Sequence, residues 1–247
     1  MELYLIYLIT FLLVVFQSIV GVGVLVLGTP LLLILNYNII EIMNLLLPIS
    51  ILTSLFNYLY LKFNKKKFKI NLDKDIKKNF ILICFPGITI GLILTREFYE
   101  YINFEILVSL FIFLSLLIKW KFELIINSLP LLTKKIILIV ISIVHGLTNS
   151  GGTLLTIFFT AFNKNKKNQS RYSITFYYLI LVAIQYLVFL TIFKKELTLD
   201  YQYQIILIIF FAVFFGNVIV KMINKKFFKI LIELIALFSA LFLLLNN

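Results

Sequence analysis

Apolar residues run along this chain in long stretches that short polar or charged segments interrupt. The stretches cover residues 3–20, 22–36, 40–61, 79–95, 104–118, 136–149, 151–162, 172–193, 203–220 and 227–245. An α-helix of roughly 20 apolar residues spans the hydrocarbon core of a bilayer. The chain is also 62% hydrophobic, whereas soluble domains are roughly half apolar. The pattern therefore predicts an all-α polytopic membrane protein whose surroundings are the lipid bilayer.

Two pairs of neighbouring stretches are separated by a single residue, Gly21 in the first pair and Ser150 in the second. One straight helix over the first pair would be roughly 50 Å long, because each residue adds about 1.5 Å. A hydrocarbon core is only about 30 Å thick. We therefore expect two broken-helix hairpins, residues 3–36 and residues 136–162, each entering and leaving the membrane on one side.

The basic residues bear on this arrangement, because cytoplasmic loops carry an excess of Lys and Arg. With both pairs as hairpins, loops 62–78, 119–135, 163–171 and 221–229 lie on one side and hold 20 of the 23 basic residues. With each pair as one tilted span, the split falls to 14 against 9. The hairpins therefore predict cytoplasmic basic loops and both termini outside. The net charge of +12 follows from this topology, so no nucleic-acid partner is expected.

The same order of elements occurs twice. An N-terminal repeat, residues 1–122, contains hairpin 3–36 and spans 40–61, 79–95 and 104–118. A C-terminal repeat, residues 134–247, contains hairpin 136–162 and spans 172–193, 203–220 and 227–245. The first repeat starts outside and the second inside, so we predict an inverted repeat within a single integral membrane domain. Such repeats, with discontinuous helices meeting near the midplane, are typical of secondary transporters.

Three further features change the picture less. Loop 62–78 alternates Lys with apolar residues, which predicts a helix on the anionic inner surface, or alternatively a docking site for a regulator. The chain opens without a basic, cleavable segment, so no removable signal peptide is predicted. No HExxH, Walker or GxSxG motif is present, and the single histidine has no Cys/His cluster around it. We therefore predict no enzyme, metal site or cofactor.

The second hairpin turns at His145-Gly146-Leu147-Thr148-Asn149-Ser150-Gly151-Gly152-Thr153, which is polar but uncharged. An unpaired polar group in hydrocarbon costs several kcal/mol, so this tip must face protein or water. Glycines break a helix, and the N–H groups at the start of the returning limb can hold an anion. The alternative is a seam of small residues that only packs helices together.

The first hairpin turns at Gln17-Ser18-Ile19-Val20-Gly21-Val22-Gly23, and Gly28-Thr29-Pro30 interrupts its return limb. If the tips meet, two positive helix ends face one point. On the next span, Asn44, Ser50, Thr53, Ser54 and Asn57 recur at spacings that favour one face. The candidate substrate-binding residues, none with a fixed charge, are Gln17, Gly21, Gly23, Thr29, Asn44, His145, Thr148, Asn149, Ser150, Gly151, Gly152 and Thr153.

Two residues are candidates for coupling transport to protons. His145 precedes the second tip by about one turn, and histidine titrates near neutral pH; a satisfied hydrogen bond between helices is the alternative. Glu233 is the only acid in the interior of a predicted span, since Glu41 and Glu105 stand at the ends of theirs. A carboxyl group inside a span indicates function by default. A structural hydrogen bond from a protonated Glu233 to Gln185 or Asn217 is the alternative.

The arrangement Gln17-Ser18-x-x-Gly21-Val22-Gly23, followed by Thr29-Pro30-Leu31-Leu32, resembles the N-terminal signature of the sulfite exporter TauE/SafE family. The stretch from His145 to Thr153 resembles its second-half counterpart, although Leu154-Leu155 stands where the family often has proline. The resemblance covers nearly the whole chain in length and duplicated plan. It implies a transporter of the bacterial cytoplasmic (inner) membrane that moves a small sulfur-containing or organic anion, such as sulfite or a sulfonate.

The predicted function is therefore a secondary transporter of a small anion, working by alternating access around the two tips, with a homodimer left open. A metal or other cation carrier is disfavoured because no carboxylate or thiol lies near the tips in sequence. An intramembrane enzyme based on Ser150 or His145 lacks a second catalytic partner. A non-transporting scaffold or assembly protein has no evident need of polar hairpin tips.

Overall fold

The computed structural model describes residues 3–63, 72–122, 128–162, 167–194 and 203–224, with scattered positions between 227 and 244. Within these ranges the chain forms nine continuous α-helices and no strand. The helices are α1 (Leu3–Val20), α2 (Val24–Ile34), α3 (Ile39–Phe63), α4 (Lys74–Phe98), α5 (Phe104–Phe122), α6 (Leu131–Thr148), α7 (Gly151–Phe162), α8 (Lys167–Phe193) and α9 (Tyr203–Met222).

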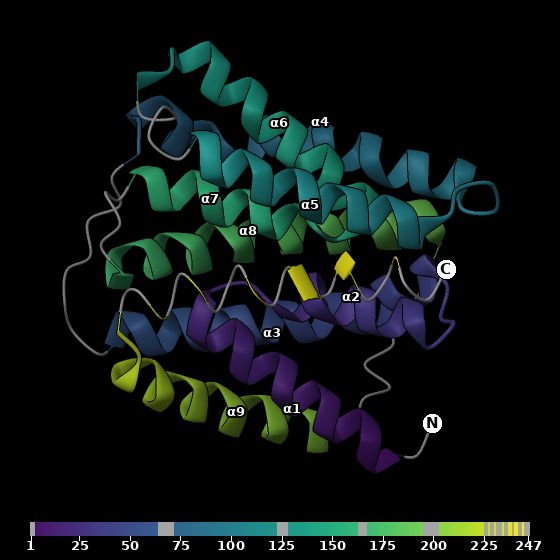
Figure 1. Cartoon of the computed structure of the whole chain (residues 1–247), viewed down its shortest axis with the longest axis vertical. Coiled ribbons are helices and arrows are strands. Elements are labelled where there is room, and N and C mark those ends of the chain that lie inside the picture. Colours follow the sequence, from purple (N-terminus) through teal and green to yellow (C-terminus); the bar gives the residue numbers. More distant parts are fainter. Residues whose placement is uncertain are drawn as a thin grey trace.

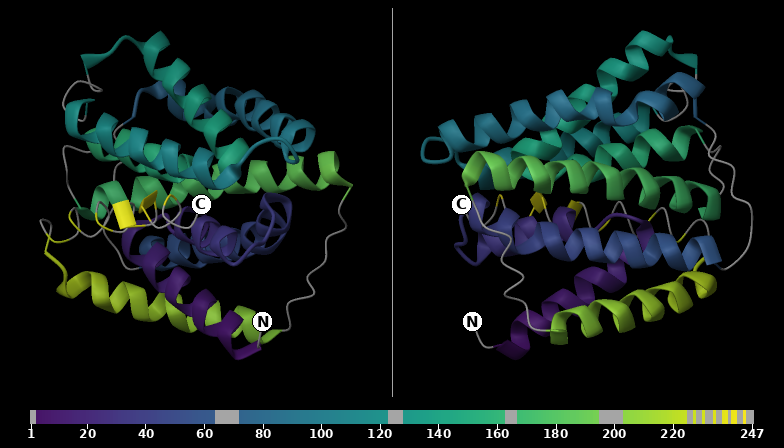
Figure 2. Two further views of the ribbon diagram at one scale, coloured as in Figure 1. Left: turned by 45° about the vertical axis from the view of Figure 1, so that its right-hand side comes forward. Right: turned by 180° about the vertical axis from the view of Figure 1, so that it is seen from behind.

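The helices lie roughly side by side. Figures 1 and 2 show α4 and α6 at one edge of the molecule, α1 and α9 at the opposite edge, and α3 and α8 between them. In the described part, α3, α4, α6, α8 and α9 are long and apolar enough to cross a membrane. The predicted all-α polytopic membrane fold is therefore confirmed. The predicted span 227–245 falls largely outside the described residues, and the inversion of the two repeats stays a prediction.

Three helices begin five residues before the apolar stretches that predicted them. Helices α4, α6 and α8 begin at Lys74, Leu131 and Lys167, so parts of the predicted basic loops are helical. Hydropathy marks where a helix enters hydrocarbon, whereas a helix can continue into the polar interface. There Lys134 pairs with Asp73 at 3.0 Å, which joins the start of α6 to the residue that precedes α4. Of the predicted surface helix over 62–78, residues 62–63 end α3 and residues 74–78 begin α4, while residues 64–71 lie outside the described part.

Both predicted hairpins are broken helices, and the breaks have different chemistry. Gly21 ends α1 with φ 101, a left-handed conformation that favours glycine. The second break occurs at Asn149, with φ 62, whose N–H donates to the His145 carbonyl at 2.9 Å. The expectation that glycine breaks this helix is therefore wrong. Asparagine adopts the left-handed region more readily than other non-glycine residues do.

Gly151, directly after the second break, allows close packing between the two limbs. A Cβ on Gly151 would lie 2.6 Å from both the His145 Cβ and the Ile141 carbonyl oxygen. Real Cβ atoms do not approach other atoms so closely. The first residue of α7 is therefore glycine because α7 folds back directly against α6.

Glycine also brings α4 and α6 into backbone contact. Gly87 and Gly91 form a G-x-x-x-G pattern on α4, and Ser142 and Gly146 form a small-residue pattern with the same spacing on α6. Cβ atoms on Gly91 and Gly146 would lie 2.4 Å and 2.5 Å from backbone carbonyl oxygens of the opposite helix. Small residues at this spacing let membrane helices pack closely. At the other edge, a Cβ on Gly216 of α9 would lie 2.7 Å from a carbonyl oxygen of α1.

We predict that Gly91→Ala destabilises the protein by about 1–3 kcal/mol, because the added methyl group meets backbone atoms that cannot move alone. Thermal unfolding of purified protein in detergent measures the effect. The control is Gly28→Ala, whose Cβ would meet the flexible ends of Leu46 and Leu13. Equal melting temperatures for the two variants would contradict a rigid α4–α6 contact.

Candidate functional site

The two hairpin tips meet in the interior of the molecule. A Cβ on Gly152 of α7 would lie 3.5 Å from the Val22 Cβ and 3.1 Å from a Val26 methyl group of the first hairpin. The Asn149 amide nitrogen donates to the Thr29 hydroxyl at 3.1 Å. Residues about 120 positions apart in the chain are thereby joined. The close contact at Gly152 is with protein side chains, so this glycine also serves packing between the tips.

Gln17 holds the first tip together. Its side-chain oxygen accepts from the Val24 N–H at 2.9 Å, and its nitrogen donates to the Ser54 hydroxyl at 2.8 Å and to the Ser50 carbonyl at 3.1 Å. The Tyr178 hydroxyl lies 3.5 Å from the Ser50 hydroxyl and close to the backbone of α2. The N-terminus of α2 is therefore capped by side chains, and its first N–H group is already occupied.

The second tip is stabilised by short bonds between neighbouring residues. The Thr148 and Ser150 hydroxyls lie 2.5 Å apart, and the Thr153 hydroxyl donates to the Ser150 carbonyl at 2.5 Å. The Thr153 N–H donates to the same carbonyl at 3.2 Å. By contrast, the N–H groups of Gly151 and Gly152 donate to no acceptor in the described ranges. The start of α7 therefore has two N–H groups for which the described residues offer no partner.

His145 and Gln185 lie beside this tip. Gln185 donates to the Asn149 side-chain oxygen at 2.8 Å and to the His145 carbonyl at 3.1 Å. The His145 ring is fully buried, 5.7 Å from the Tyr178 ring and close to the Asn149 backbone. Among the residues described, neither imidazole nitrogen makes a hydrogen bond, and nor does the Gln185 oxygen. The tip thus has acceptors and donors that the described protein does not satisfy.

A buried polar seam runs between α3 and α8 and passes both tips. The predicted polar face of α3 is fully buried at Ser50, Thr53, Ser54 and Asn57. The facing side of α8 contributes Arg171, Thr175, Tyr178 and Gln185, all buried. The Asn57 amide lies within 3.4 Å of the Thr175 hydroxyl, which links the two helices. The seam therefore contacts both tips, through Gln17 at the first and Gln185 at the second.

Arg171 is placed differently from its prediction. The sequence suggested a cytoplasmic loop over 163–171, but Arg171 lies in α8 and is 3% exposed. It donates to the Ser18 carbonyl and to the side-chain oxygens of Asn57 and Asn217. Hydropathy alone does not reveal that α8 begins within this Lys-rich segment, because lysines lower the apolar score there. The available signal was the single arginine among those lysines, at four- and seven-residue spacing from Thr175 and Tyr178.

Of the remaining predicted site residues, some pack at the tips and others lie away from them or outside the described part. Gly21 packs against α8, where its Cβ would lie 3.0 Å from Ile174, and Gly23 packs against the Gln17 backbone at the same distance. Asn44 is half-buried on α3, and no hydrogen bond joins it to either tip. Glu233 lies outside the described residues. In the part of the chain described, no group of three His, Cys, Asp or Glu residues could hold a metal ion.

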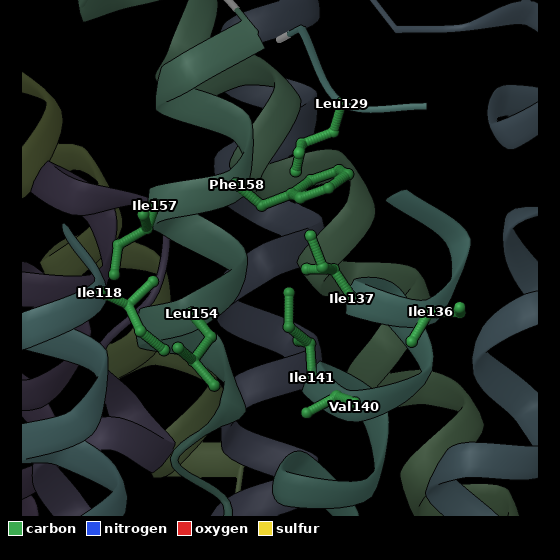
Figure 3. Close-up of a pocket in the computed structure, with 9 residues that line it drawn as sticks. All are labelled: Ile118, Leu129, Ile136, Ile137, Val140, Ile141, Leu154, Ile157 and Phe158. Atoms are coloured by element: carbon green, nitrogen blue, oxygen red, sulfur yellow. The ribbon is translucent and has the colours of Figure 1, made fainter. Parts of the chain in front are cut away.

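An apolar pocket of about 290 Å³ lies between α5, α6 and α7, and none of the predicted site residues lines it. Figure 3 shows side chains converging on it from all three helices, among them Ile118, Ile137 and Phe158. Every lining side chain is aliphatic or aromatic. With no donor or charge, this pocket cannot recognise an anion, and the tips remain the candidate site.

We predict that Val22→Cys and Gly152→Cys, combined in a Cys84→Ser background, form a disulfide on mild oxidation. Disulfides join Cβ atoms about 3.5–4.5 Å apart, and these two would be 3.5 Å apart. Loss of reactivity towards a maleimide reagent, restored by reduction, measures the bond. Thr160→Cys replaces Gly152→Cys in the control, since it lies roughly 12 Å further along α7. A pair that stays reactive after oxidation would show that the tips do not meet.

Comparison with known proteins identifies the family. The sequence profile of the family described as sulfite exporter TauE/SafE matches residues 6–243, nearly the whole chain. The chain therefore belongs to the sulfite exporter TauE/SafE family, a family of membrane transporters. Neither the curated proteins nor the solved structures gave a match.

Proposed function

We propose that this family member is a secondary transporter of a small sulfur-containing or organic oxyanion, such as sulfite or a sulfonate, working by alternating access. The substrate is proposed to bind where the hairpin tips meet. The residues that line or shape this site are Gln17, Gly21, Gly23, Thr29, His145, Thr148, Asn149, Ser150, Gly151, Gly152 and Thr153. Asn44 is assigned to the approach along α3, since it does not contact the tips.

The observation that carries the proposal is the unfilled start of α7. The Gly151 and Gly152 N–H groups have no acceptor among the described residues. The N-terminus of a helix carries roughly half a positive charge and binds anions through such groups. The imidazole nitrogens of His145, also without partners there, lie on the adjoining turn. An oxyanion at this point would satisfy donors that otherwise stay unpaired in a buried site.

The chemistry of the tip suits binding followed by release. Except for His145, its polar groups are hydroxyls, amides and backbone N–H groups, which carry no fixed charge. Such donors bind an oxyanion through hydrogen bonds of defined direction. The anion can then leave without breaking an ion pair at the tip. A metal cation would need carboxylate, thiolate or several imidazole ligands, which the described tip residues do not offer. A scaffold protein would not need unpaired donors at a buried helix break.

The packing of the helices supports alternating access by inverted repeats. The first limb of each hairpin packs against a span of the other predicted repeat: α1 against α9, and α6 against α4. Exchanging the halves 1–122 and 134–247 maps one pair onto the other. We infer that each pair moves as a unit past the α3–α8 seam and opens it to one side at a time. The charge distribution supports basic loops in the cytoplasm.

We predict that Asn149→Asp abolishes transport of the substrate anion while the protein still folds. The carboxylate can keep accepting from Gln185, and the Thr29 hydroxyl can donate to it. Its charge would repel an anion at the start of α7. Asn149→Ala removes one or two hydrogen bonds of about 1–3 kcal/mol each when the partner is charged. That corresponds to roughly a fivefold to hundredfold weaker affinity.

Sulfite flux into proteoliposomes and thermal stabilisation by sulfite, sulfate, thiosulfate and short sulfonates measure these effects. Asn36→Asp is the matched control, because Asn36 also has φ 62 but is exposed at the end of α2. It should leave both readouts unchanged. Full transport by Asn149→Asp would reduce the tip to a packing seam. If no anion of the panel binds or moves with the parent protein, the transport proposal itself fails.

Proton coupling is proposed for His145 or Glu233. We predict that His145→Gln or Glu233→Gln, whichever residue carries the proton, removes the dependence of sulfite flux on an imposed pH gradient. Either glutamine keeps hydrogen bonding but cannot titrate. Sulfite binding should survive in the Glu233 variant. If both variants keep the pH dependence of the parent, neither residue carries a coupling proton.

A further inference from the structure

The second turn of α8 contains a buried cation that the hairpin-tip proposal does not use. The chain has two arginines. Arg96 is largely exposed and lies 3.9 Å from Glu97, whereas Arg171 is 3% exposed. Removing an ion from water costs several kcal/mol unless partners replace the water. The surroundings of Arg171 therefore determine what its charge can do.

Every hydrogen-bond partner of Arg171 in the described ranges is neutral. Its Nε donates to the Ser18 carbonyl at 2.9 Å, and Nη2 donates to that same carbonyl. Nη2 also donates to the side-chain oxygens of Asn57 at 3.0 Å and Asn217 at 2.6 Å. No described carboxylate lies within ion-pair distance of the guanidinium. The contacts fix one edge of the group and leave its positive charge without a described counter-charge.

The other edge of the guanidinium is unused. Within the described part of the chain, Nη1 donates to no acceptor, so two N–H groups remain. The buried hydroxyls of Ser18 and Ser170, adjacent to this cluster in sequence, also lack partners there. A fixed guanidinium presents its N–H groups to an oxyanion in a defined direction and keeps its charge at any physiological pH. These are the elements of an anion site.

Capping of α1 explains only part of this arrangement. The Ser18 carbonyl belongs to the last turn of α1, and a cation near a helix C-terminus is stabilising. That contact uses one edge of the group. It does not explain why asparagines from α3 and α9 also accept from Arg171. Nor does it explain why Nη1 has no described acceptor. Neutral amides orient a guanidinium without cancelling its charge, which is what a reversible anion site requires.

We propose that Arg171 forms a second anion position on the transport path and selects the substrate for negative charge. It lies at the same seam as the hairpin tips, roughly 20 Å along α8 from Gln185. The inference rests on the proposed function and assigns its charge selectivity to one residue. An oxyanion there would be bound by Nη1, while Nε and Nη2 stay anchored on Ser18, Asn57 and Asn217. The anion supplies the counter-charge and then moves on to the position at the hairpin tips.

Asn57→Asp is the most direct test. The Asn57 oxygen already accepts from Arg171 and from Asn217, so a carboxylate fits the same contacts and becomes a permanent internal anion. We expect a folded protein whose sulfite affinity, measured by thermal stabilisation, and sulfite flux fall at least tenfold. Arg171→Gln should lose affinity similarly, and Arg171→Lys should retain part of it. Arg96→Gln, which removes an exposed charge, and Asn36→Asp are the controls and should match the parent.

Glu233 provides the decisive comparison, because it is the only acid in the interior of a predicted span and lies outside the described residues. If Arg171→Gln/Glu233→Gln restores the sulfite affinity that Arg171→Gln loses, Arg171 is an ion-pair partner and the inference is overturned. It is equally overturned if Asn57→Asp binds sulfite within twofold of the parent. Should Arg171→Gln fail to fold, Asn57→Asp still decides. If the parent protein binds no anion of the panel, the proposed function fails rather than this assignment.

Discussion

The need to satisfy polar groups where helices end inside an apolar bundle governs the rest of this structure. Four helix ends lie at the two breaks, and an unpaired polar group there costs several kcal/mol. Gln17 caps the start of α2, Arg171 binds a carbonyl in the last turn of α1, and Gln185 binds the end of α6. At the start of α7, the N–H groups of Gly151 and Gly152 have no described acceptor, whereas the first N–H group of α2 donates to Gln17. That difference is the basis for proposing the start of α7 as the anion site.

Close packing through glycine complements this constraint. The first limb of each hairpin is held less by its own return limb than by a distant span, α6 by α4 and α1 by α9. Glycines allow these helices to pack closely, because the backbones of the two helices are in contact at Gly91, Gly146 and Gly216. Membrane helices gain no hydrophobic driving force from each other, so such contacts carry much of their association. The pairs are therefore suited to move as units while α3 and α8 keep the polar seam.

The electrostatics of the seam follow from its composition. Hydroxyl and amide groups line most of it, and Arg171 is its one described residue with a permanent charge. In the proposed transporter, a path lined by neutral groups with a single fixed cation favours anions over cations. The three neutral acceptors of Arg171 preserve that charge, since none of them can neutralise it.

The sequence by itself determined the helices, the two breaks and the polar tips, because hydrophobic length and helix interruption are local properties. It also contained the family signature at Gln17–Gly23 and at the second tip. Only the tertiary structure decided which side chains form hydrogen bonds with one another. Arg171 binds Ser18 across 153 positions, and Asn217 binds Asn57 across 160. Arg171 stands in a Lys-rich segment, so its burial was not predicted. The neighbouring glycines suggested a glycine break, whereas Asn149 is the residue that breaks the helix. Hydrogen-bond partners so distant in the chain are set by packing, which no local pattern encodes.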